Sequence, residues 1–284
     1  MTSNRRFCVF ILSHGRADNV RTLKTLMAQG YTGEWRIVID DEDPQMGDYL
    51  DEYGDNVVVF NKEDVAARMD EADTFGDRRT VVYARNACFD IAKEMGLTHF
   101  LELDDDYTSF EHRYVEGDKL KVRKTKNLDL IFDAFLDWLD DTGAMTVAMA
   151  QGGDIIGGVG NSRLRESCLR KAMNSFFCRT DREFKFLGRV NEDVNTYVTY
   201  GSRGRLLFTT MHFSLVQQQT QKSSGGMSEM YLDEGTYVKS FYTVMYAPSC
   251  VRVMPMGDKH MRLHHNVKWN CAVPKILNEC WKKA

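Results

Sequence analysis

The sequence predicts an α/β protein with a mostly parallel sheet that is flanked by helices. Two observations carry this prediction: short apolar runs alternate with helical patterns along the first half of the chain, and acidic or polar residues follow the carboxyl ends of those runs. A strand that is buried on both faces appears as a continuous apolar run. Because parallel strands must be joined by long crossovers, the alternation favours β-α-β units.

The first expected strand covers residues 7–12, which are all apolar. We expect Asp18 to cap the next helix, whose apolar residues fall on one face, and Gly30 to end it. The remaining strands are expected at residues 35–39, 57–60, 98–103 and 145–150, and the remaining helices at residues 78–95 and 128–139. The second half of the chain is less regular, with glycine-rich or polar stretches at residues 151–160 and 217–226.

The most informative motif is the triplet Asp104, Asp105 and Asp106, which follows the strand expected at residues 98–103. Three adjacent carboxylates repel one another unless a cation neutralises them. The hard cations Mg²⁺ and Mn²⁺ prefer such oxygen ligands and often bridge a diphosphate. The motif therefore favours a metal-bound phosphate substrate, with a helix cap or an acidic surface turn as the alternatives.

Other polar residues are expected to converge near this triplet. His14 and Asp40 also follow predicted strands, and ligands of parallel sheets bind at the carboxyl ends of the strands. Arg85 offers a guanidinium for phosphate or carboxylate, and Asn86 an amide for a base or ribose. An ordinary surface ion pair is the alternative for these two residues.

Composition limits the classes of protein. The 284 residues, 43% hydrophobic, indicate a single elaborated globular domain. The longest apolar runs fall short of the roughly 20 residues that span a bilayer, and the N-terminal run is too short for a signal peptide. Seven cysteines without a C-x-x-C pair favour reduced thiols, no zinc site and a cytoplasmic location.

The net charge of −4 conceals an uneven distribution. Residues 40–73 contain thirteen acidic residues, whereas residues 161–205 contain ten Lys or Arg and five acids. The densest basic run covers residues 121–126. These basic segments either contact a polyanion such as DNA or form ordinary solvated surfaces.

The order of motifs resembles that of GT-A glycosyltransferases, which use nucleotide sugars. More closely, the chain is similar to the TET-associated glycosyltransferases of bacteriophages, thought to act on hydroxymethylated pyrimidines in DNA. The narrower resemblance lies in residues 191–197, 235–240 and 264–275. The motifs that match the GT-A class are Ser13-His14-Gly15-Arg16, the acidic cluster that begins at Asp40, Tyr83-Ala84-Arg85-Asn86, Asp104-Asp105-Asp106 and Asn191-Glu192-Asp193-Val194.

The resemblance implies a role for each matched residue. Asp106 would bind Mn²⁺ or Mg²⁺ directly, and Asp104 would bind it through water or contact the ribose. Asp193 would be the general base, with Glu192 as its neighbour. Three consecutive aspartates leave open which two form the D-x-D pair. The donor is expected to be a UDP-sugar. Its binding site would be lined by Ser13, His14, Arg16, Asp40, Tyr83, Arg85, Asn86, Asp104 and Asp105.

The resemblance also implies a division of the single domain of residues 1–284 into a nucleotide-binding half, residues 1–106, and an acceptor-side half, residues 107–284. A late histidine, His264 ahead of His265 or His260, would be a further metal ligand; a structural hydrogen-bonding role is the alternative. Glu192 and Asp193 are also suited to a helix N-terminus capped by Asn191.

The chemistry of the proposed reaction agrees with these residues. A divalent cation neutralises a leaving diphosphate, and a carboxylate deprotonates an attacking hydroxyl. A base on the face opposite the leaving group would invert the anomeric centre. Two alternatives remain: a nucleotidyltransferase of similar fold, or a non-catalytic DNA-binding or assembly protein. The loop Ser13-His14-Gly15-Arg16 lacks the lysine typical of the former, and the intact carboxylates disfavour the latter.

Overall fold

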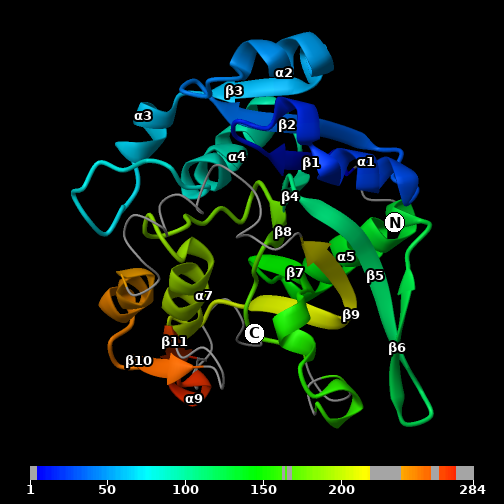
Figure 1. Cartoon of the computed structure of the whole chain (residues 1–284), viewed down its shortest axis with the longest axis vertical. Helices are drawn as coiled ribbons and strands as arrows, with labels where there is room; N and C mark the ends of the chain where they lie inside the picture. The colour runs from blue at the N-terminus through cyan, green and yellow to red at the C-terminus, as the bar shows by residue number, and fades with distance from the viewer. Residues whose placement is uncertain (1–4, 162–163, 165–167, 218–237, 257–261, 273–284) are drawn as a thin grey trace, which may run out of the picture.

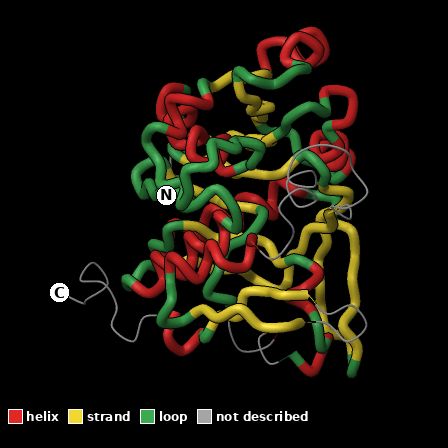
Figure 2. The backbone as a smooth tube through the Cα atoms, turned by 60° about the vertical axis from the view of Figure 1, so that its left-hand side comes forward, coloured by secondary structure: helices red, strands yellow, loops and turns green. Residues whose placement is uncertain are grey.

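The computed structural model describes residues 5–161, 164, 168–217, 238–256 and 262–272. Its centre is a nine-stranded sheet with helices on both faces (Figures 1 and 2). The strand order is β3-β2-β1-β4-β8-β7-β9-β5-β6. The strands are β1 (Phe7–Leu12), β2 (Glu34–Asp40), β3 (Val57–Phe60), β4 (His99–Asp104), β5 (Tyr107–Glu116), β6 (Lys119–Lys124), β7 (Thr146–Ala150), β8 (Ser175–Arg179) and β9 (Leu207–Gln217).

The predicted fold class is confirmed. Strands β3, β2, β1 and β4 are parallel neighbours, and β7 and β9 form a further parallel pair. Strand β8 runs antiparallel between β4 and β7, and β5 and β6 complete an antiparallel edge. A separate two-stranded sheet joins β10 (Val251–Met256) and β11 (Arg262–Val267). The helices are α1 (Arg21–Ala28), α2 (Met46–Tyr53), α3 (Lys62–Ala66), α4 (Val82–Glu94), α5 (Leu128–Thr142), α7 (Glu192–Ser202), a helix at 238–246 and α9 (Trp269–Ala272).

Two hydrophobic cores lie on opposite faces of the sheet. In β1, Cys8 and Phe10 belong to one core and Val9 and Ile11 to the other. This division explains why the β1 sequence is continuously apolar, since successive side chains of a strand point to opposite faces. Helix α4 packs in the first core, and α1 and α5 pack in the second.

Two predicted helix starts are wrong. Helix α4 begins at Val82 rather than at residue 78, because Asp77 accepts hydrogen bonds from the backbone and side chain of Arg79 and holds a non-helical turn. Asp18 does not cap α1; it lies in a short 3₁₀ turn, and the N-cap Val20 makes no side-chain cap bond. Instead, in the first turn of α1, the Thr22 backbone N–H donates a hydrogen bond to the Asp105 carbonyl at 3.0 Å.

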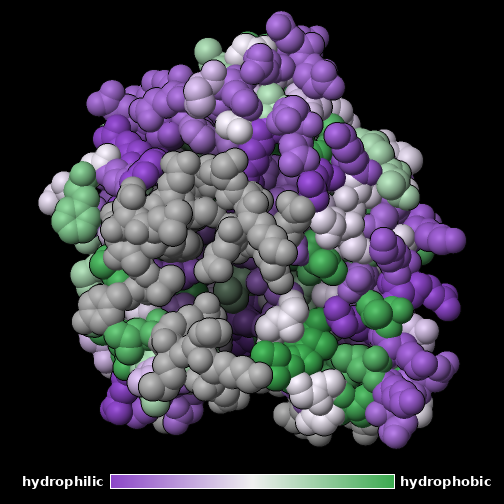
Figure 3. Space-filling view, viewed as in Figure 1, coloured by the Kyte–Doolittle hydropathy of each residue, from purple (hydrophilic) through white to green (hydrophobic). Residues whose placement is uncertain are grey.

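The acidic segment of residues 40–73 forms the end of the molecule around α2, β3 and α3. Figure 3 shows that this end is predominantly hydrophilic. The basic run of residues 121–126 begins in β6, so it is partly an edge strand of the sheet. In the part of the chain that the structure describes, no helix is long and apolar enough to cross a membrane.

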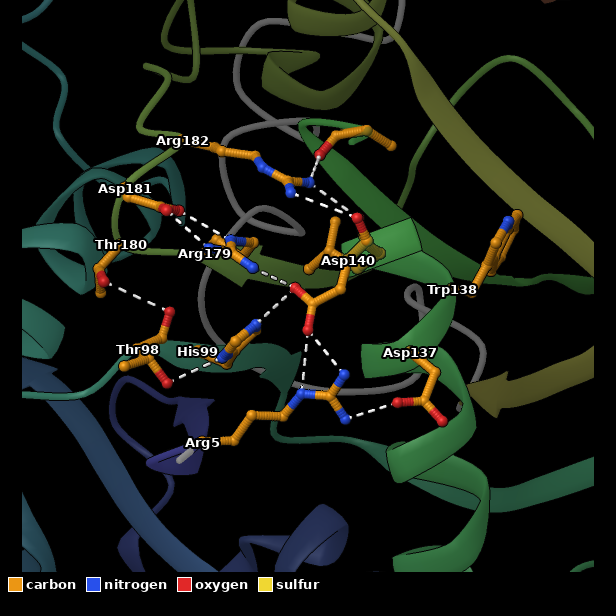
Figure 4. A network of polar contacts seen from close by, with 12 residues as sticks. Arg5, Thr98, His99, Asp137, Trp138, Asp140, Arg179, Thr180, Asp181 and Arg182 are labelled. Carbon is orange, nitrogen blue, oxygen red and sulfur yellow. Dashed lines mark hydrogen bonds and ion pairs between the residues drawn. The ribbon is translucent and has the colours of Figure 1, made fainter. Parts of the chain in front are cut away.

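A polar network joins β4, β8 and α5 at the end of β4 opposite the aspartate triplet (Figure 4). Asp140 of α5 accepts hydrogen bonds from Arg5 at 2.6 Å and from Arg179, and it pairs with His99 at 3.0 Å. Burial acts to raise the pKa of Asp140, but His99, Arg179 and Arg5 outweigh it and hold the pKa well below its usual range. The network therefore ties the start of β4 to the end of β8.

Candidate active site

The aspartate triplet lies at the carboxyl end of β4, beside the end of β1, where Leu12 is in register with Asp104. The carboxyl ends of these two parallel strands bring the triplet next to the loop that follows β1. The backbone of the triplet is fixed by α1, since the Thr22 hydroxyl donates to the carbonyl of Asp104 and accepts from the Tyr107 backbone. The predicted position of the triplet at a strand end is confirmed.

Asp105 is buried and turned toward the loop that follows β1. Its Oδ2 accepts a hydrogen bond from the Ser13 hydroxyl at 2.6 Å, and its Oδ1 accepts from the Arg16 guanidinium at 2.9 Å. Gly15, between these residues, has φ +64°, a conformation that favours glycine, and its N–H donates to Asp43. Both Asp105 oxygens have protein partners and only 6% of the side chain is exposed, so Asp105 is the least accessible member of the triplet to a ligand.

Asp106 is the least satisfied member of the triplet. Its Oδ2 accepts from the Gln217 amide at 3.2 Å, whereas its buried Oδ1 has no hydrogen-bond partner among the described residues. Burial, followed by the charges of Asp104 and Asp105, raises the pKa of Asp106 to about 7. A buried carboxylate oxygen without a partner is costly and is a suitable ligand for a hard cation.

Asp104 is held from two sides. Its Oδ1 accepts from Arg85 at 2.9 Å, and its Oδ2 lies 3.1 Å from the Tyr107 hydroxyl. The side chain keeps 21% of its surface exposed, more than Asp105 does at 6%. Asp104 can therefore face a ligand while its orientation is fixed by the protein.

Arg85 is a fully buried guanidinium among three carboxylates. It pairs with Asp104 at 2.9 Å and Glu192 at 3.2 Å, and it lies 3.7 Å from Glu102. Burial raises the pKa of Glu102 to about 8 and, together with the nearby charge of Asp193, the pKa of Glu192 to about 7. The sequence suggested that Arg85 contacts the donor. Because only 1% of its side chain is exposed, Arg85 instead orients the surrounding carboxylates.

Glu192 and Asp193 begin α7 and are both buried. The preceding residue, Asn191, is the N-cap with φ +58°, but its side chain makes no cap bond, so that part of the prediction is wrong. Its amide donates to the Lys239 carbonyl at 2.8 Å instead. Asp193 Oδ1 accepts from the Val194 backbone at 2.7 Å, and burial raises the pKa of Asp193 although the charges of Lys239, Arg85 and Lys171 oppose it.

A second polar cluster lies at the carboxyl ends of β1 and β2. His14 Nδ1 lies 2.9 Å from Asp40 Oδ2, and Lys62 pairs with Asp40 Oδ1 at 2.7 Å. The hydrogen bond with Asp40 raises the pKa of His14. Asp40 is buried, whereas 43% of the His14 side chain is exposed, so His14 presents this cluster to a ligand. The predicted convergence of His14, Asp40 and Asp104 on one edge of the sheet agrees with these positions.

Two residues predicted to contact the donor have protein partners instead. The hydroxyl of the buried Tyr83 donates to Glu71. The amide of Asn86 donates to the Phe186 carbonyl at 3.1 Å and accepts from the Phe186 backbone at 2.8 Å. These contacts hold α4 in place, and a donor-binding role does not fit either side chain.

The late histidines within the described ranges, His264 and His265, belong to no group of three or more potential metal ligands. His260 lies outside the described residues, and His264 lies on β11. The Nδ1 of His265 is 3.2 Å from the Asn191 amide, and burial, together with the charge of His264, lowers the pKa of His265 to about 3. Across the described ranges, no group of three or more His, Cys, Asp or Glu side chains has a metal-binding arrangement. The predicted ligand set of Asp104, Asp106 and His264 stays a prediction, in which Asp104 ends β4 and His264 lies on β11.

Sequence reasoning missed four supporting residues. Glu102 interrupts an otherwise apolar strand, and such a buried acid could have signalled a buried cationic partner. Tyr107 follows the triplet directly. Gln217 contacts Asp106 from β9, and Tyr49 contacts Ser13 from α2 at 2.6 Å; neither has a local sequence signal.

The chain matches one protein family and several solved structures. The model of a family described as TET-associated glycosyltransferase matches residues 7–226. No curated protein matches the chain. Crystal structures of glucosyl-3-phosphoglycerate synthase from Mycobacterium tuberculosis are similar to it in fold. The complex with Mn²⁺, uridine diphosphate and phosphoglyceric acid has 9% identity and a TM-score of 0.44, over 93% of this chain and 87% of that chain. The complex with Mg²⁺ and uridine diphosphate has 9% identity and a TM-score of 0.45 over the same shares.

Proposed function

This chain belongs to the TET-associated glycosyltransferase family, and from that premise we propose that it moves a sugar from a nucleotide-sugar donor to a 5-hydroxymethylpyrimidine in DNA. The observation that carries the proposal is the acidic pair Asp104 and Asp106 at the end of β4, with one buried Asp106 oxygen lacking a hydrogen-bond partner among the described residues. The reaction needs a neutralised diphosphate, a held nucleoside and a base for the acceptor hydroxyl. Each need has candidate residues at this edge of the sheet.

Asp104 and Asp106 would hold the divalent cation. Both offer the oxygen ligands that Mn²⁺ and Mg²⁺ prefer, and the raised pKa of Asp106 reflects a negative charge that lacks a counter-charge. When bound, the cation supplies positive charge for the leaving diphosphate. Tyr107 and Arg85 fix the orientation of Asp104, and Gln217 contributes to that of Asp106.

The nucleoside of the donor, for which UDP-sugars are the first candidates, would lie over the ends of β1 and β2. His14 is exposed there and is oriented by Asp40, which is itself held by Lys62. Arg16 is partly exposed and is steered by Asp105. A cationic side chain in this position can contact the phosphates, while the His14 ring can stack on or hydrogen-bond to a base.

Asp193 is the better candidate for the general base. Glu192 shares the guanidinium of Arg85, whereas Asp193 accepts only a backbone hydrogen bond among the described contacts. Burial raises the pKa of Asp193 toward the range in which a carboxylate accepts a proton efficiently. Inversion would result if the acceptor hydroxyl gave its proton to Asp193 and attacked C1 from the face opposite the leaving diphosphate.

The acceptor is inferred from the family and from the hydroxyl chemistry. A 5-hydroxymethyl group of duplex DNA lies in the major groove, so the base would leave the stack to reach Asp193. Among the ten basic residues within positions 161–205, Lys171, Arg179 and Arg189 form ion pairs within the protein, so only part of the positive charge of this segment is available to a polyanionic acceptor.

The test is sugar transfer from a panel of UDP-sugars, with Mn²⁺, to duplexes that contain 5-hydroxymethylcytosine or 5-hydroxymethyluracil. The wild type is expected to transfer at least one sugar, and Asp193→Asn is expected to lose roughly 10²–10⁴-fold in turnover. The Mn²⁺-dependent thermal stabilisation by the donor should persist in Asp193→Asn, because the base does not hold the cation. Asp51→Asn, on the exposed side of α2, is the control. Full turnover by Asp193→Asn would contradict the assignment.

A further inference from the structure

The β5–β6 hairpin extends outward from the candidate active site. Strand β5 begins at Tyr107, directly after the aspartate triplet, and pairs with β9 on one side and β6 on the other. Strand β6 is the edge of the sheet, and the hairpin reaches away from the body of the molecule in Figure 1. At about 3.3 Å per residue, the stretch from His112 to Tyr114 lies on the order of 20 Å along the strand from Asp106.

The two faces of this hairpin differ. On one face, Arg113 donates to the Ser214 hydroxyl at 2.8 Å, and Leu120 packs against a small apolar cluster with Leu164 and Leu169. That face is covered by the protein. On the opposite face, His112 is in register with Arg123, and Tyr114 with Lys121. Cross-strand partners project to the same side of a sheet.

The open face carries a row of three rings that ends beside a guanidinium. The Phe213 and His112 rings are 5.1 Å apart, and the His112 and Tyr114 rings are stacked at 5.6 Å and 21°. The guanidinium of Arg123 lies 6.0 Å from the centre of the Tyr114 ring. Stacking on an aromatic ring limits the motion of a guanidinium, so that its donors are already directed when a ligand arrives.

The same face carries three exposed cations, of which two have no ion-pair partner among the described residues. Lys119, Lys121 and Arg123 are all exposed. Over the ranges that the structure describes, Lys121 has one acidic partner, Glu116 at 3.6 Å, and Lys119 and Arg123 have no ion-pair partner. Figure 3 shows mainly hydrophilic side chains along the right-hand edge, where Figure 1 places this hairpin. We define Lys119, Lys121, Arg123, His112 and Tyr114 as the hairpin face.

We propose that the hairpin face binds the phosphate backbone of DNA beside the acceptor base. This inference rests on the proposed function, since it assigns a docking surface for the same substrate. Exposed lysines and a pre-oriented arginine match the charge of successive phosphates. The cations lie on β6, which pairs along β5, and β5 begins directly after the triplet, so DNA held on the hairpin is held in a fixed relation to the catalytic carboxylates.

The test is the salt dependence of DNA affinity, measured by fluorescence anisotropy with a labelled duplex and its single strand, in the full chain. Each lost phosphate contact lowers the slope of log affinity against log salt by roughly 0.9 for a duplex. The double variant Lys121→Gln/Arg123→Gln should therefore lower the slope by about 2, and Lys119→Gln by about 1. Tyr114→Leu should weaken binding, and Tyr114→Phe should restore it because the ring remains.

Lys93→Gln is the matched control, because Lys93 is 44% exposed and pairs with one glutamate, whereas Lys121 is 46% exposed and also pairs with one. An unchanged slope in both Lys119→Gln and the double variant, or no DNA binding by the wild type, would overturn the inference. Donor binding is scored separately, as thermal stabilisation by UDP-sugar with Mn²⁺, and should be the same in every hairpin variant. If the wild type is not stabilised by any UDP-sugar with Mn²⁺, that result would instead count against the proposed function.

Discussion

The three aspartates of the triplet are chemically identical in sequence but have different surroundings. Asp105 is turned inward to Ser13 and Arg16, Asp104 is held by Arg85, and Asp106 leaves one buried oxygen without a hydrogen-bond partner among the described residues. The run therefore combines one structural carboxylate with two that can face a cation. This separation of roles leads to two predictions at the scale of single residues.

The first prediction concerns Asp105→Asn. This substitution weakens two hydrogen bonds that involve a charged group, so it should lower the free energy of unfolding by roughly 1.5–3 kcal/mol. The affinity for Mn²⁺ should change little, because Asp105 does not face the cation. Urea denaturation and isothermal titration measure the two quantities, with Asp118→Asn in the exposed hairpin turn as the control. A stable variant that had lost its Mn²⁺ affinity would contradict this assignment.

The second prediction concerns pH. The pKa values of Asp106 and Glu192 are raised to about 7 and that of Glu102 to about 8, whereas unfolded carboxyls titrate near pH 4. The folded state therefore binds more protons, so without metal the protein should lose stability as pH rises from about 5 to 8. The Asp106→Asn variant should lose less stability than the wild type over this pH range. Chemical denaturation in EDTA measures both proteins, and parallel profiles would contradict the role of Asp106.

At the scale of elements, Arg85 joins three of them. It projects from α4 and pairs with Asp104 at the end of β4 and with Glu192 at the start of α7. Its guanidinium also lies 4.8 Å from the centre of the Phe176 ring of β8. One buried side chain therefore holds both Asp104, a member of the proposed cation pair, and Glu192, the neighbour of the candidate base Asp193.

The third prediction is that Arg85→Met destabilises the protein by about 3–5 kcal/mol, because it leaves buried carboxylates without their counter-charge. Arg68→Met removes an exposed pair with Asp90, 57% and 40% exposed, and should cost less than about 1 kcal/mol. Urea denaturation at pH 7 compares the two variants. A cost for Arg85→Met as small as that for Arg68→Met would refute the structural role of Arg85.

Much of the sheet could be predicted from sequence. Strands β1 and β3 have the predicted bounds, because buried parallel strands leave continuous apolar runs. Helix α5 was recognisable from its amphipathic pattern, and it extends past residue 139 to Thr142 before Gly143 ends it at φ +62°. The position of the triplet followed from the same reasoning, since strand ends on one edge of a parallel sheet must be close together.

The orientation of the site residues could not be predicted. Nothing local distinguishes Asp105 from Asp106, because their difference depends on Arg16 and on Gln217, which is 111 residues away in the chain. Arg85 and Asn86 are adjacent in sequence, yet one meets carboxylates and the other the backbone of Phe186. Such long-range contacts decide whether a polar side chain serves a ligand or the fold.

At the scale of the whole molecule, the sheet changes character at β4. On one side lie the parallel strands β1, β2 and β3, with the cluster of His14 and Asp40 at their ends. On the other side the sheet becomes mixed and ends in the basic β5–β6 hairpin. The division into a donor half and an acceptor half stays a proposal, in which the aspartate pair lies at the boundary between the two halves.

The most direct test of this account is the Mn²⁺ dependence of UDP binding in wild type and Asp106→Asn. Isothermal titration of UDP at pH 7.5 or so, with and without Mn²⁺, measures it, and Asp118→Asn is the control. We expect Mn²⁺ to strengthen UDP binding by at least about tenfold, or 1.4 kcal/mol, in the wild type and the control, and to have no effect in Asp106→Asn. Equal Mn²⁺ dependence in all three proteins would contradict the claim that the aspartate pair holds the cation.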